Sequence, residues 1–435
     1  MRGKKISIGL TAVLAIAAMA LLVTGTRADA QTETVLYSFF YDYGNDGSYP
    51  SAGVIFDAAG NLYGTTSYGG SGSCASSSLV IGCGTVFELT PTVSGGWTEK
   101  ILHSFNNDGA DGVGPAAGLV FDARGNLYGT TKYGGTGGSC AAMYLTNFAG
   151  CGTVFELTPA ADGEWTEGVL HSFNYSAGDG SFPLASLALD AFGNLYGTTS
   201  QGGTGSCRGV TGTGPVTGCG TVFEVSRATE GIWREKLLHS FVNDRSDGNH
   251  PCSNLIFDAV GNLYGTTLSG GKSELLGTVF ELSPGSGERW SERVIHNFEG
   301  GNQTPEAGLI FDAAGNLYGT GLYTVFELVH GANGVWTEKT LHDFGTLGTF
   351  AYGVIFDPSG NLYGTTNSHL DGSVYELTPE VGGGWGARTL HHFGCCPEDG
   401  TEPTLGLILD AAGNLYGTTG GGGTYNNGTV FEITP

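Results

Sequence analysis

Residues 57–66 read DAAGNLYGTT, and close copies of this ten-residue phrase return along the whole chain of 435 residues. There are seven copies, whose starts lie 65, 68, 68, 54, 45 and 53 residues apart. Each copy begins with an aspartate, at Asp57, Asp122, Asp190, Asp258, Asp312, Asp357 and Asp410. A repeat of this length decides the architecture, because each copy must belong to one structural unit that packs on its neighbours.

Each copy lies inside a longer unit of four short runs. An apolar run ends in the aspartate, GNLYGTT follows, GTVFELTP comes after a loop of variable length, and a Gly-rich turn leads to WTEKILHSF. Runs rich in Val, Phe, Tyr and Thr, separated by turn residues, predict a four-stranded antiparallel sheet. The 78 glycines and the charged fraction of only 13% agree with an all-β chain that has many turns.

The two ends of the chain complement each other. The TVFEL run or a variant of it occurs seven times, but the tryptophan strand follows it only six times, starting at Trp97, Trp165, Trp233, Trp290, Trp336 and Trp385. The missing outer strand resembles residues 32–39, TETVLYSF. Pairing the first strand with the last leaves no open sheet edge. We therefore predict a seven-bladed β-propeller over residues 31–435, closed by the N-terminal strand, with an open solenoid as the alternative.

The repeated phrase itself has the chemistry of a turn. Aspartate suits the first position of a type I turn and glycine the left-handed position that starts a bulge. The copy at Asp357 has Pro358 at the second position, where a fixed φ suits this turn. We interpret the phrase as structural, with glycines at Gly60, Gly125, Gly193, Gly261, Gly315, Gly360 and Gly413. Seven Ca²⁺ sites are a weak alternative, because one aspartate per turn is far from the six to eight oxygens that calcium takes.

Three further residues recur with the repeat and receive the same structural interpretation. They are the glutamate of VFEL (Glu88 and its equivalents), the histidine of LHSF (His103 and its equivalents) and the tryptophan of the outer strand. A catalytic base is rarely needed six times around a ring. We expect the tryptophans to pack between blades rather than to serve as sugar platforms.

Residues 1–30 have the features of a secretory signal peptide. Arg2, Lys4 and Lys5 precede the apolar run 6–23, and Ala28 and Ala30 form a cleavage motif. A retained anchor is the alternative, because the run is near the minimum length of a membrane span. We expect cleavage near Ala30, no retained membrane anchor, and a secreted or periplasmic protein.

The formal net charge of −24 argues against nucleic acid as a partner, because phosphates would be repelled. The same charge is compatible with bound Ca²⁺, but nothing in the sequence requires it. We expect no metal site and no cofactor.

Nine cysteines divide into loop pairs and a remainder. Three pairs each lie within one long loop between the second and third runs, and an exported protein favours disulfides there: Cys74–Cys83, Cys140–Cys151 and Cys207–Cys219. Their spacings do not resemble those of a zinc site, which is the alternative. We expect a vicinal Cys395–Cys396 bridge that leaves Cys252 buried.

Alternating strand direction places the loops on two rims. One rim carries the uniform Asp-x-x-Gly-Asn turns; the other carries the variable loops, where binding sites usually reside. Aromatic residues in these loops are ligand-binding candidates: Tyr68, Tyr133, Tyr144 and Tyr425. Five Asp-Gly pairs also fall there, and we interpret them as turn formers, with an acidic collar around the central pore as the alternative: Asp46, Asp111, Asp179, Asp247 and Asp399, each followed by glycine.

The residues that break the repeat are the only candidates for catalysis. His250, His369, Arg208 and Arg245 lie on the irregular rim, where a histidine base and an arginine could support a polysaccharide lyase or hydrolase. A recognition module that binds an extracellular glycan or surface protein on this rim is the favoured hypothesis, and a structural scaffold is the third. The sequence does not indicate an oligomeric state.

The pattern DGxxPxxGLxxDxxGNLYGTTxxGG, followed by GTVFELTP and LHSF, resembles the GloVer tandem-repeat family of exported bacterial proteins, of the choice-of-anchor type. The resemblance covers the whole expected mature chain. It implies a surface or extracellular β-propeller of unassigned biochemical role and supplies no catalytic residues. The chain departs from the family in ending at Pro435, inside a predicted strand, so we expect release rather than tethering.

Overall fold

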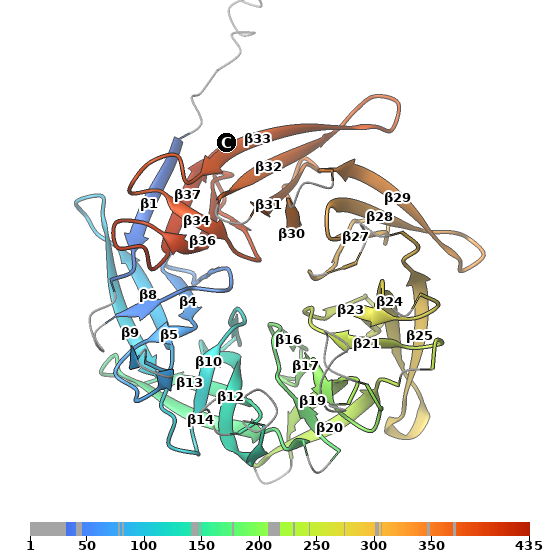
Figure 1. The fold of residues 1–435 in the computed structure, drawn as a ribbon, viewed down its shortest axis with the longest axis horizontal. Coiled ribbons are helices and arrows are strands. Elements are labelled where there is room, and N and C mark those ends of the chain that lie inside the picture. Colours follow the sequence, from blue (N-terminus) through green and yellow to red (C-terminus); the bar gives the residue numbers. More distant parts are fainter. Residues whose placement is uncertain are drawn as a thin grey trace, which may run out of the picture.

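The computed structural model describes residues 32–40, 46–76, 79–80, 82–140, 148, 150–175, 178–207, 218–228, 231–242, 244–273, 275–300, 304–305, 307–345, 349–368 and 371–435. These residues form seven antiparallel sheets arranged around a central axis (Figure 1). The predicted seven-bladed β-propeller is therefore confirmed. The expected signal peptide, residues 1–30, lies outside the described residues.

Each blade runs from an inner strand to an outer one that carries the repeated tryptophan or, in blade 7, begins the described chain. Blade 1 has β3 (Ile55–Phe56), β4 (Leu62–Thr66), β8 (Thr85–Pro91) and β9 (Trp97–Ser104). Blade 2 has β10 (Gly112–Pro115), β11 (Val120–Phe121), β12 (Leu127–Ser139), β13 (Thr153–Pro159) and β14 (Trp165–Ser172). Blade 3 has β16 (Ala188–Leu189), β17 (Leu195–Thr199), β19 (Thr221–Arg227) and β20 (Trp233–Ser240). Blade 4 has β21 (Gly248–Pro251), β22 (Ile256–Phe257), β23 (Leu263–Gly270), β24 (Thr278–Pro284) and β25 (Trp290–Asn297).

The remaining blades follow the same order. Blade 5 has β26 (Ile310–Phe311), β27 (Leu317–Thr320), β28 (Thr324–His330) and β29 (Trp336–Asp343). Blade 6 has β30 (Phe350–Phe356), β31 (Leu362–Ser368), β32 (Asp371–Pro379) and β33 (Trp385–Phe393). Blade 7 has β34 (Gly400–Pro403), β35 (Ile408–Leu409), β36 (Leu415–Gly422), β37 (Thr429–Thr434) and β1 (Thr32–Ser38).

Several short strands and a 3-10 turn are added to the seven blades. In blades 2, 4 and 7 the inner strand is broken into two pieces that pair with the same second strand. In blades 1 and 3 the first piece forms a separate two-stranded ribbon, β2 (Gly47–Ser48) with β5 (Tyr68–Gly69) and β15 (Gly180–Ser181) with β18 (Gln201–Gly202). A third ribbon joins β6 (Ala75–Ser76) and β7 (Leu79–Val80), and a 3-10 turn covers Ser286–Glu288. No helix among the described residues is long and apolar enough to cross a membrane.

The ring is closed by the first described strand. β1 pairs antiparallel with β37, with Thr32 opposite Thr434 and Ser38 opposite Thr429 (Figure 1). The inner side of the same junction is also bonded, because the Thr418 hydroxyl donates to the Ala52 carbonyl over 2.8 Å. The second strands of blades 1, 2, 3, 4 and 6 make the equivalent bond to the next blade, for example from Thr65 to Ala117 over 2.9 Å. The junction of the chain ends is thus built like the other blade interfaces.

The core lies between adjacent blades rather than within one sheet. Phe105, at the end of an outer strand, meets Phe155 of the next blade edge to face at 5.1 Å, and both are fully buried. The repeated tryptophan also crosses this boundary, since Trp165 of blade 2 packs on Tyr63 of blade 1 at 6.2 Å. The predicted packing role of the tryptophans is therefore confirmed. Gly129 is required here, because a Cβ atom would lie 2.6 Å from the Phe155 ring.

Candidate functional site

The two rims of the propeller differ in the way that the sequence predicts. On the uniform rim the Asp122 side chain accepts hydrogen bonds from the backbone N–H of Arg124 (2.8 Å) and Asn126 (2.9 Å). Gly125 donates to the Asp122 carbonyl at 3.1 Å and has φ +85°, the left-handed conformation that glycine favours. The same bonds recur at all seven copies, so the repeated phrase is a structural turn.

The repeated glutamate of VFEL completes this arrangement. The Tyr128 hydroxyl lies 3.2 Å from Asp122 and 2.7 Å from Glu156, and it bridges the turn and the third strand. Burial opposes ionisation of Asp122, but its hydrogen bonds outweigh burial and hold the pKa of that carboxyl below its usual value. Burial and the Glu156 carboxylate raise the pKa of Tyr128, so this hydroxyl keeps its proton. The predicted structural role of this glutamate is confirmed.

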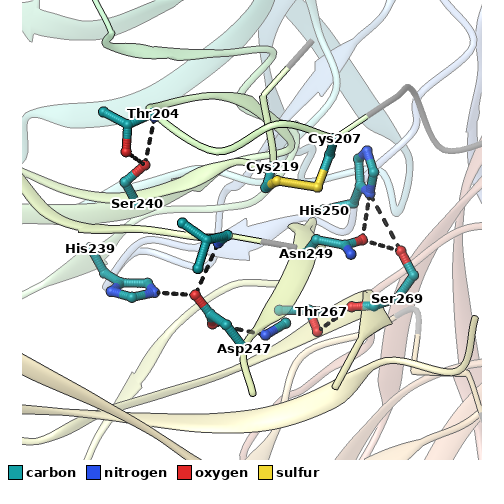
Figure 2. Close-up of a disulfide and its surroundings, with 12 residues drawn as sticks. Thr204, Cys207, Cys219, His239, Ser240, Asp247, Asn249, His250, Thr267 and Ser269 are labelled. Atoms are coloured by element: carbon teal, nitrogen blue, oxygen red, sulfur yellow. Dashed lines mark hydrogen bonds and ion pairs between the residues drawn. A yellow bond between two sulfur atoms is a disulfide. The ribbon is translucent and has the colours of Figure 1, made fainter. Parts of the chain in front are cut away.

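Disulfides staple the longest loops of the irregular rim. The three predicted pairs, Cys74–Cys83, Cys140–Cys151 and Cys207–Cys219, are all bonded and their cysteines are buried. Figure 2 shows the third, beside which the backbone N–H of Thr204 donates to the Ser240 hydroxyl at 2.7 Å. The disulfide closes the loop on itself, and the hydrogen bond to Ser240 holds the loop against the outer strand of its own blade. Three disulfides are typical of an oxidising compartment.

The other three cysteines do not form the expected vicinal bridge. The sulfurs of Cys395 and Cys396 lie 2.9 Å apart, but both residues are exposed thiols. Cys252 is half-buried, not buried, and lines the central channel.

One backbone position on the irregular rim has an unusual conformation in four blades. It is the residue directly before the proline that follows each Asp-Gly pair. This residue has positive φ although it carries a side chain: Tyr49 (56°), Phe182 (58°), His250 (56°) and Glu402 (57°). In blade 2 the same position is Gly114. A left-handed non-glycine residue costs on the order of 1–2 kcal/mol. Such strain at a position with varied side chains favours a role for the side chains themselves.

Two of these strained residues, Tyr49 and Glu402, open onto a cleft of about 450 Å³. The cleft lies where blades 6, 7 and 1 meet, and its polar and aromatic lining includes Tyr49, Tyr68, Tyr352, Asn367 and Glu402. Tyr49 and Tyr68 are 44% and 38% exposed, so their ring faces are available to a ligand. The predicted candidate Tyr68 is therefore a wall of this cleft.

The cleft walls are held by backbone bonds. The Tyr49 N–H donates to the Asn427 carbonyl at 2.8 Å, and the Tyr49 carbonyl accepts from the Ser67 N–H at 3.0 Å. The rings of Tyr49 and Tyr68 meet edge to face at 5.8 Å. Tyr49 is thereby fixed between blade 7 and the second strand of its own blade, and the aromatic pair is positioned before any ligand arrives.

The central channel has different chemistry. This cavity of about 330 Å³ is lined by the inner strands of all seven blades, mostly by Gly, Ala, Ser, Leu and Ile. Among its described lining residues, Cys252 is the only one with a titratable side chain. General acid–base catalysis needs a positioned titratable group, so the channel wall is a poor site for it.

The remaining candidates are dispersed. His250 is buried, and its Nδ1 lies 2.8 Å from Asn249 Oδ1 (Figure 2). Arg245, on the loop before it, is exposed. Tyr133 packs against Phe148 at 5.3 Å and is half-buried, and Tyr425 is exposed beside Phe40. The other three predicted candidates lie outside the described residues: Tyr144, His369 and Arg208.

The Asp-Gly aspartates are bound to the outer strands rather than gathered around the channel. Asp247 accepts from His239 Nε2 at 3.0 Å, as Figure 2 shows, and His103, His171 and His391 contact their own aspartates in the same way. At the seventh junction the Tyr37 hydroxyl donates to Asp46 at 2.9 Å. These four histidines thus hold the loop that leads into the next blade, whereas His296 contacts Glu338 at 3.0 Å.

Sequence reasoning missed a further residue, the glutamate of the outer strand. Burial, and then the charge of the neighbouring aspartate, raises the pKa of Glu167 to about 7. Glu33, Glu235 and Glu292 have pKa values of about 7 and Glu99 about 8 for the same reasons. The signal was present as the recurring Trp-x-Glu of the outer strand.

Comparisons with known proteins support the fold and the repeat. The family model of the Gloeobacter/Verrucomicrobia repeat matches residues 22–213. None of the curated proteins matches the chain in sequence.

Solved structures with the same fold include the selenomethionine-substituted virginiamycin B lyase from Staphylococcus aureus, with a TM-score of 0.52, 12% identity, and coverage of 93% of this chain and 99% of that one. A streptogramin B lyase structure has a TM-score of 0.52 and 11% identity, with coverage of 93% and 97%. A protein from Lactobacillus plantarum has a TM-score of 0.52 and 15% identity, with coverage of 80% and 95%. At such identities the likeness shows the fold alone. The repeats within residues 22–213 therefore match the Gloeobacter/Verrucomicrobia repeat.

Proposed function

We propose that the protein is a recognition module that binds a glycan in the cleft between blades 6, 7 and 1. The observation that carries this proposal is the pair Tyr49 and Tyr68, two exposed rings fixed edge to face on the rim. Sugar rings have apolar C–H faces that stack on aromatic side chains. The amide of Asn367 and the carboxylate of Glu402 in the same cleft supply partners for sugar hydroxyls.

The strain at Tyr49 and Glu402 supports the same proposal. A glycine would relieve the left-handed backbone at both positions, as Gly114 does in blade 2. Keeping a tyrosine and a glutamate there costs stability, and a ligand that contacts both side chains gives the reason for it.

Charge narrows the ligand class. With 41 acidic and 17 basic residues the protein repels polyanions, and Glu402 adds a carboxylate to the cleft itself. We therefore propose neutral polysaccharides as ligands rather than uronic-acid or sulfated ones.

Affinity electrophoresis in gels that contain neutral polysaccharides (β-glucan, xylan, mannan) tests the proposal. We expect retardation by at least one of them, and a tenfold or greater loss of affinity in Tyr49→Ala and Tyr68→Ala, roughly the 1.4 kcal/mol that one aromatic contact contributes. Tyr425→Ala is the matched control, since it removes an exposed ring from the same rim away from the cleft. Retardation that survives both cleft substitutions would refute this site.

The alternative of an extracellular lyase or hydrolase is tested in the same samples. Assays for reducing ends and unsaturated products should remain negative, because the lining of the channel within the described residues offers only Cys252 as a titratable group. Turnover that persists in Tyr49→Ala and disappears in His250→Ala would replace our proposal with an enzyme.

A further inference from the structure

At four blade junctions, near the outer strands, a histidine, an aspartate and a glutamate lie close together. In each cluster one nitrogen or oxygen of every side chain lies within 4.8 Å of the other two. The clusters are His103–Asp111–Glu167, His171–Asp179–Glu235, His239–Asp247–Glu292 and His391–Asp399–Glu33.

The repeat builds each cluster from three different segments. The histidine ends the outer strand of one blade, the aspartate follows in the loop eight residues later, and the glutamate belongs to the outer strand of the next blade. The aspartate is fixed before any ion arrives: Asp111 accepts from the backbone N–H of Asn106 (2.9 Å) and of Gly112 (2.6 Å). Figure 2 shows the histidine and aspartate of the third cluster facing each other below the disulfide loop.

The glutamates have acceptor capacity that the protein does not use. Within the described residues, Oε1 of Glu33, Glu167, Glu235 and Glu292 is buried and receives no hydrogen bond. By contrast, the glutamates of the VFEL strands have partners, for example Arg227 and Tyr128 at Glu156. A buried carboxylate oxygen without a donor costs free energy unless a proton or a cation meets it.

We infer that these four clusters bind divalent transition cations, Zn²⁺ above all, through one imidazole nitrogen and two carboxylate oxygens. Two ligands that share such an ion at about 2.0–2.2 Å lie roughly 2.8–3.6 Å apart. The histidine–aspartate distances of 3.2, 2.9, 3.0 and 3.2 Å fall in this range, and a glutamate oxygen lies within 4.8 Å of both ligand atoms.

The donor set selects the cation class. Imidazole with two carboxylates suits zinc and its neighbours, whereas calcium takes six to eight oxygens. Three protein ligands leave a coordination position for water, and the histidines are about one-fifth exposed, so the ion has access from solvent. Bound ions would link adjacent blades and stabilise the folded ring.

Zinc binding to the full chain, measured by equilibrium dialysis, tests the inference. We expect four ions per chain, a loss of one ion in each of His103→Ala, His171→Ala and His239→Ala, and the same loss in Glu167→Gln, which keeps the side-chain shape. His342→Ala is the matched control, because its junction has Ala387 where the others have the glutamate. A stoichiometry that none of the histidine substitutions changes would overturn the inference.

Two further variants separate loss of metal binding from loss of folding, and separate binding by the clusters from binding by the exposed thiols. Tyr37→His should raise the stoichiometry to five, because Tyr37 stands with Asp46 and Glu99 where the other junctions have histidine. Cys395→Ser/Cys396→Ser should keep four ions; if binding disappears in this variant, the thiols and not the clusters hold the metal. Binding of Ca²⁺ without Zn²⁺ would also contradict the assignment.

Discussion

The two rims of this propeller stand on the same seven blades, yet one is nearly invariant and the other differs from blade to blade. On the uniform rim each turn repeats the hydrogen bonds of Asp122, although the two residues in the middle of the turn vary. On the irregular rim, three blades carry stapled loops, four carry strained side chains, and one junction forms an aromatic cleft. We infer from this difference that the repeated residues stabilise the fold, whereas the residues that depart from the repeat have specific roles.

The largest expected effect concerns the staples of the irregular rim. Removing the Cys207–Cys219 bridge with a double serine substitution should lower the free energy of unfolding by about 3 kcal/mol, the loop-closure contribution for a separation of this size. Urea unfolding under oxidising conditions measures it. Cys395→Ser/Cys396→Ser on the same rim removes no disulfide and should leave the midpoint unchanged. If the two variants lower the free energy of unfolding equally, the disulfide is not what stabilises this rim.

The next effect concerns the uniform rim. Asp122→Ala removes the acceptor of two backbone donors, of the Asn126 amide (2.9 Å) and of the Tyr128 hydroxyl. We expect a loss of about 2 kcal/mol in the free energy of unfolding. Arg124→Ala in the same turn is the control, since Arg124 is exposed, and it should change stability little. A cost below about 0.5 kcal/mol for Asp122→Ala would show that the turn is not a stabilising element.

A third substitution should act in the opposite direction. Tyr49→Gly relieves a φ of 56° and should raise the free energy of unfolding by about 1 kcal/mol while weakening glycan binding. Tyr68→Gly, where φ is not positive, should instead lower stability while it also weakens binding. If both variants destabilise the protein equally, the strain at Tyr49 has no measurable cost, and the contrast between the rims loses that support.

The smallest effect is a pH dependence on the outer surface. Burial, and then the charge of Asp46, raises the pKa of Glu99 to about 8, above the usual 4.5. Because the folded protein holds this proton more tightly than the unfolded chain, the contribution to stability is complete below pH 4.5 and is lost as the pH rises through 8. Glu99→Gln should therefore lose less stability than the unsubstituted protein between pH 5 and 8 in thermal unfolding. The exposed Glu380→Gln should follow the unsubstituted protein.

Much of the fold could be predicted because repetition makes counting possible. Seven phrases, six tryptophan strands and the match of residues 32–39 to the missing strand lead directly to a closed ring. The loop cysteines could be paired because each pair lies in one loop. The contacts of Asp111 with His103 could also have been found, because the same offset of eight residues returns in three other repeats.

The cleft could not be predicted in the same way. Tyr49, Tyr352 and Glu402 come from three blades, and only the closed ring brings them together. Nor does a sequence show that Tyr133 turns inward onto Phe148, while Tyr68 remains exposed. Side-chain direction on an irregular loop depends on the neighbouring blade, and repeat periodicity does not carry that information.

The pairing of β1 with β37 has a consequence for the order in which the blades can form. β1 precedes blades 1 to 6 in the chain and β37 follows them, so the sheet of blade 7 can be completed only after the residues of the other six blades have been synthesised. A circular permutant that joins the two ends and opens a different blade junction should therefore keep the ring while changing which blade forms last. Such permutants would move the ring-closing strand pair to a chosen blade junction.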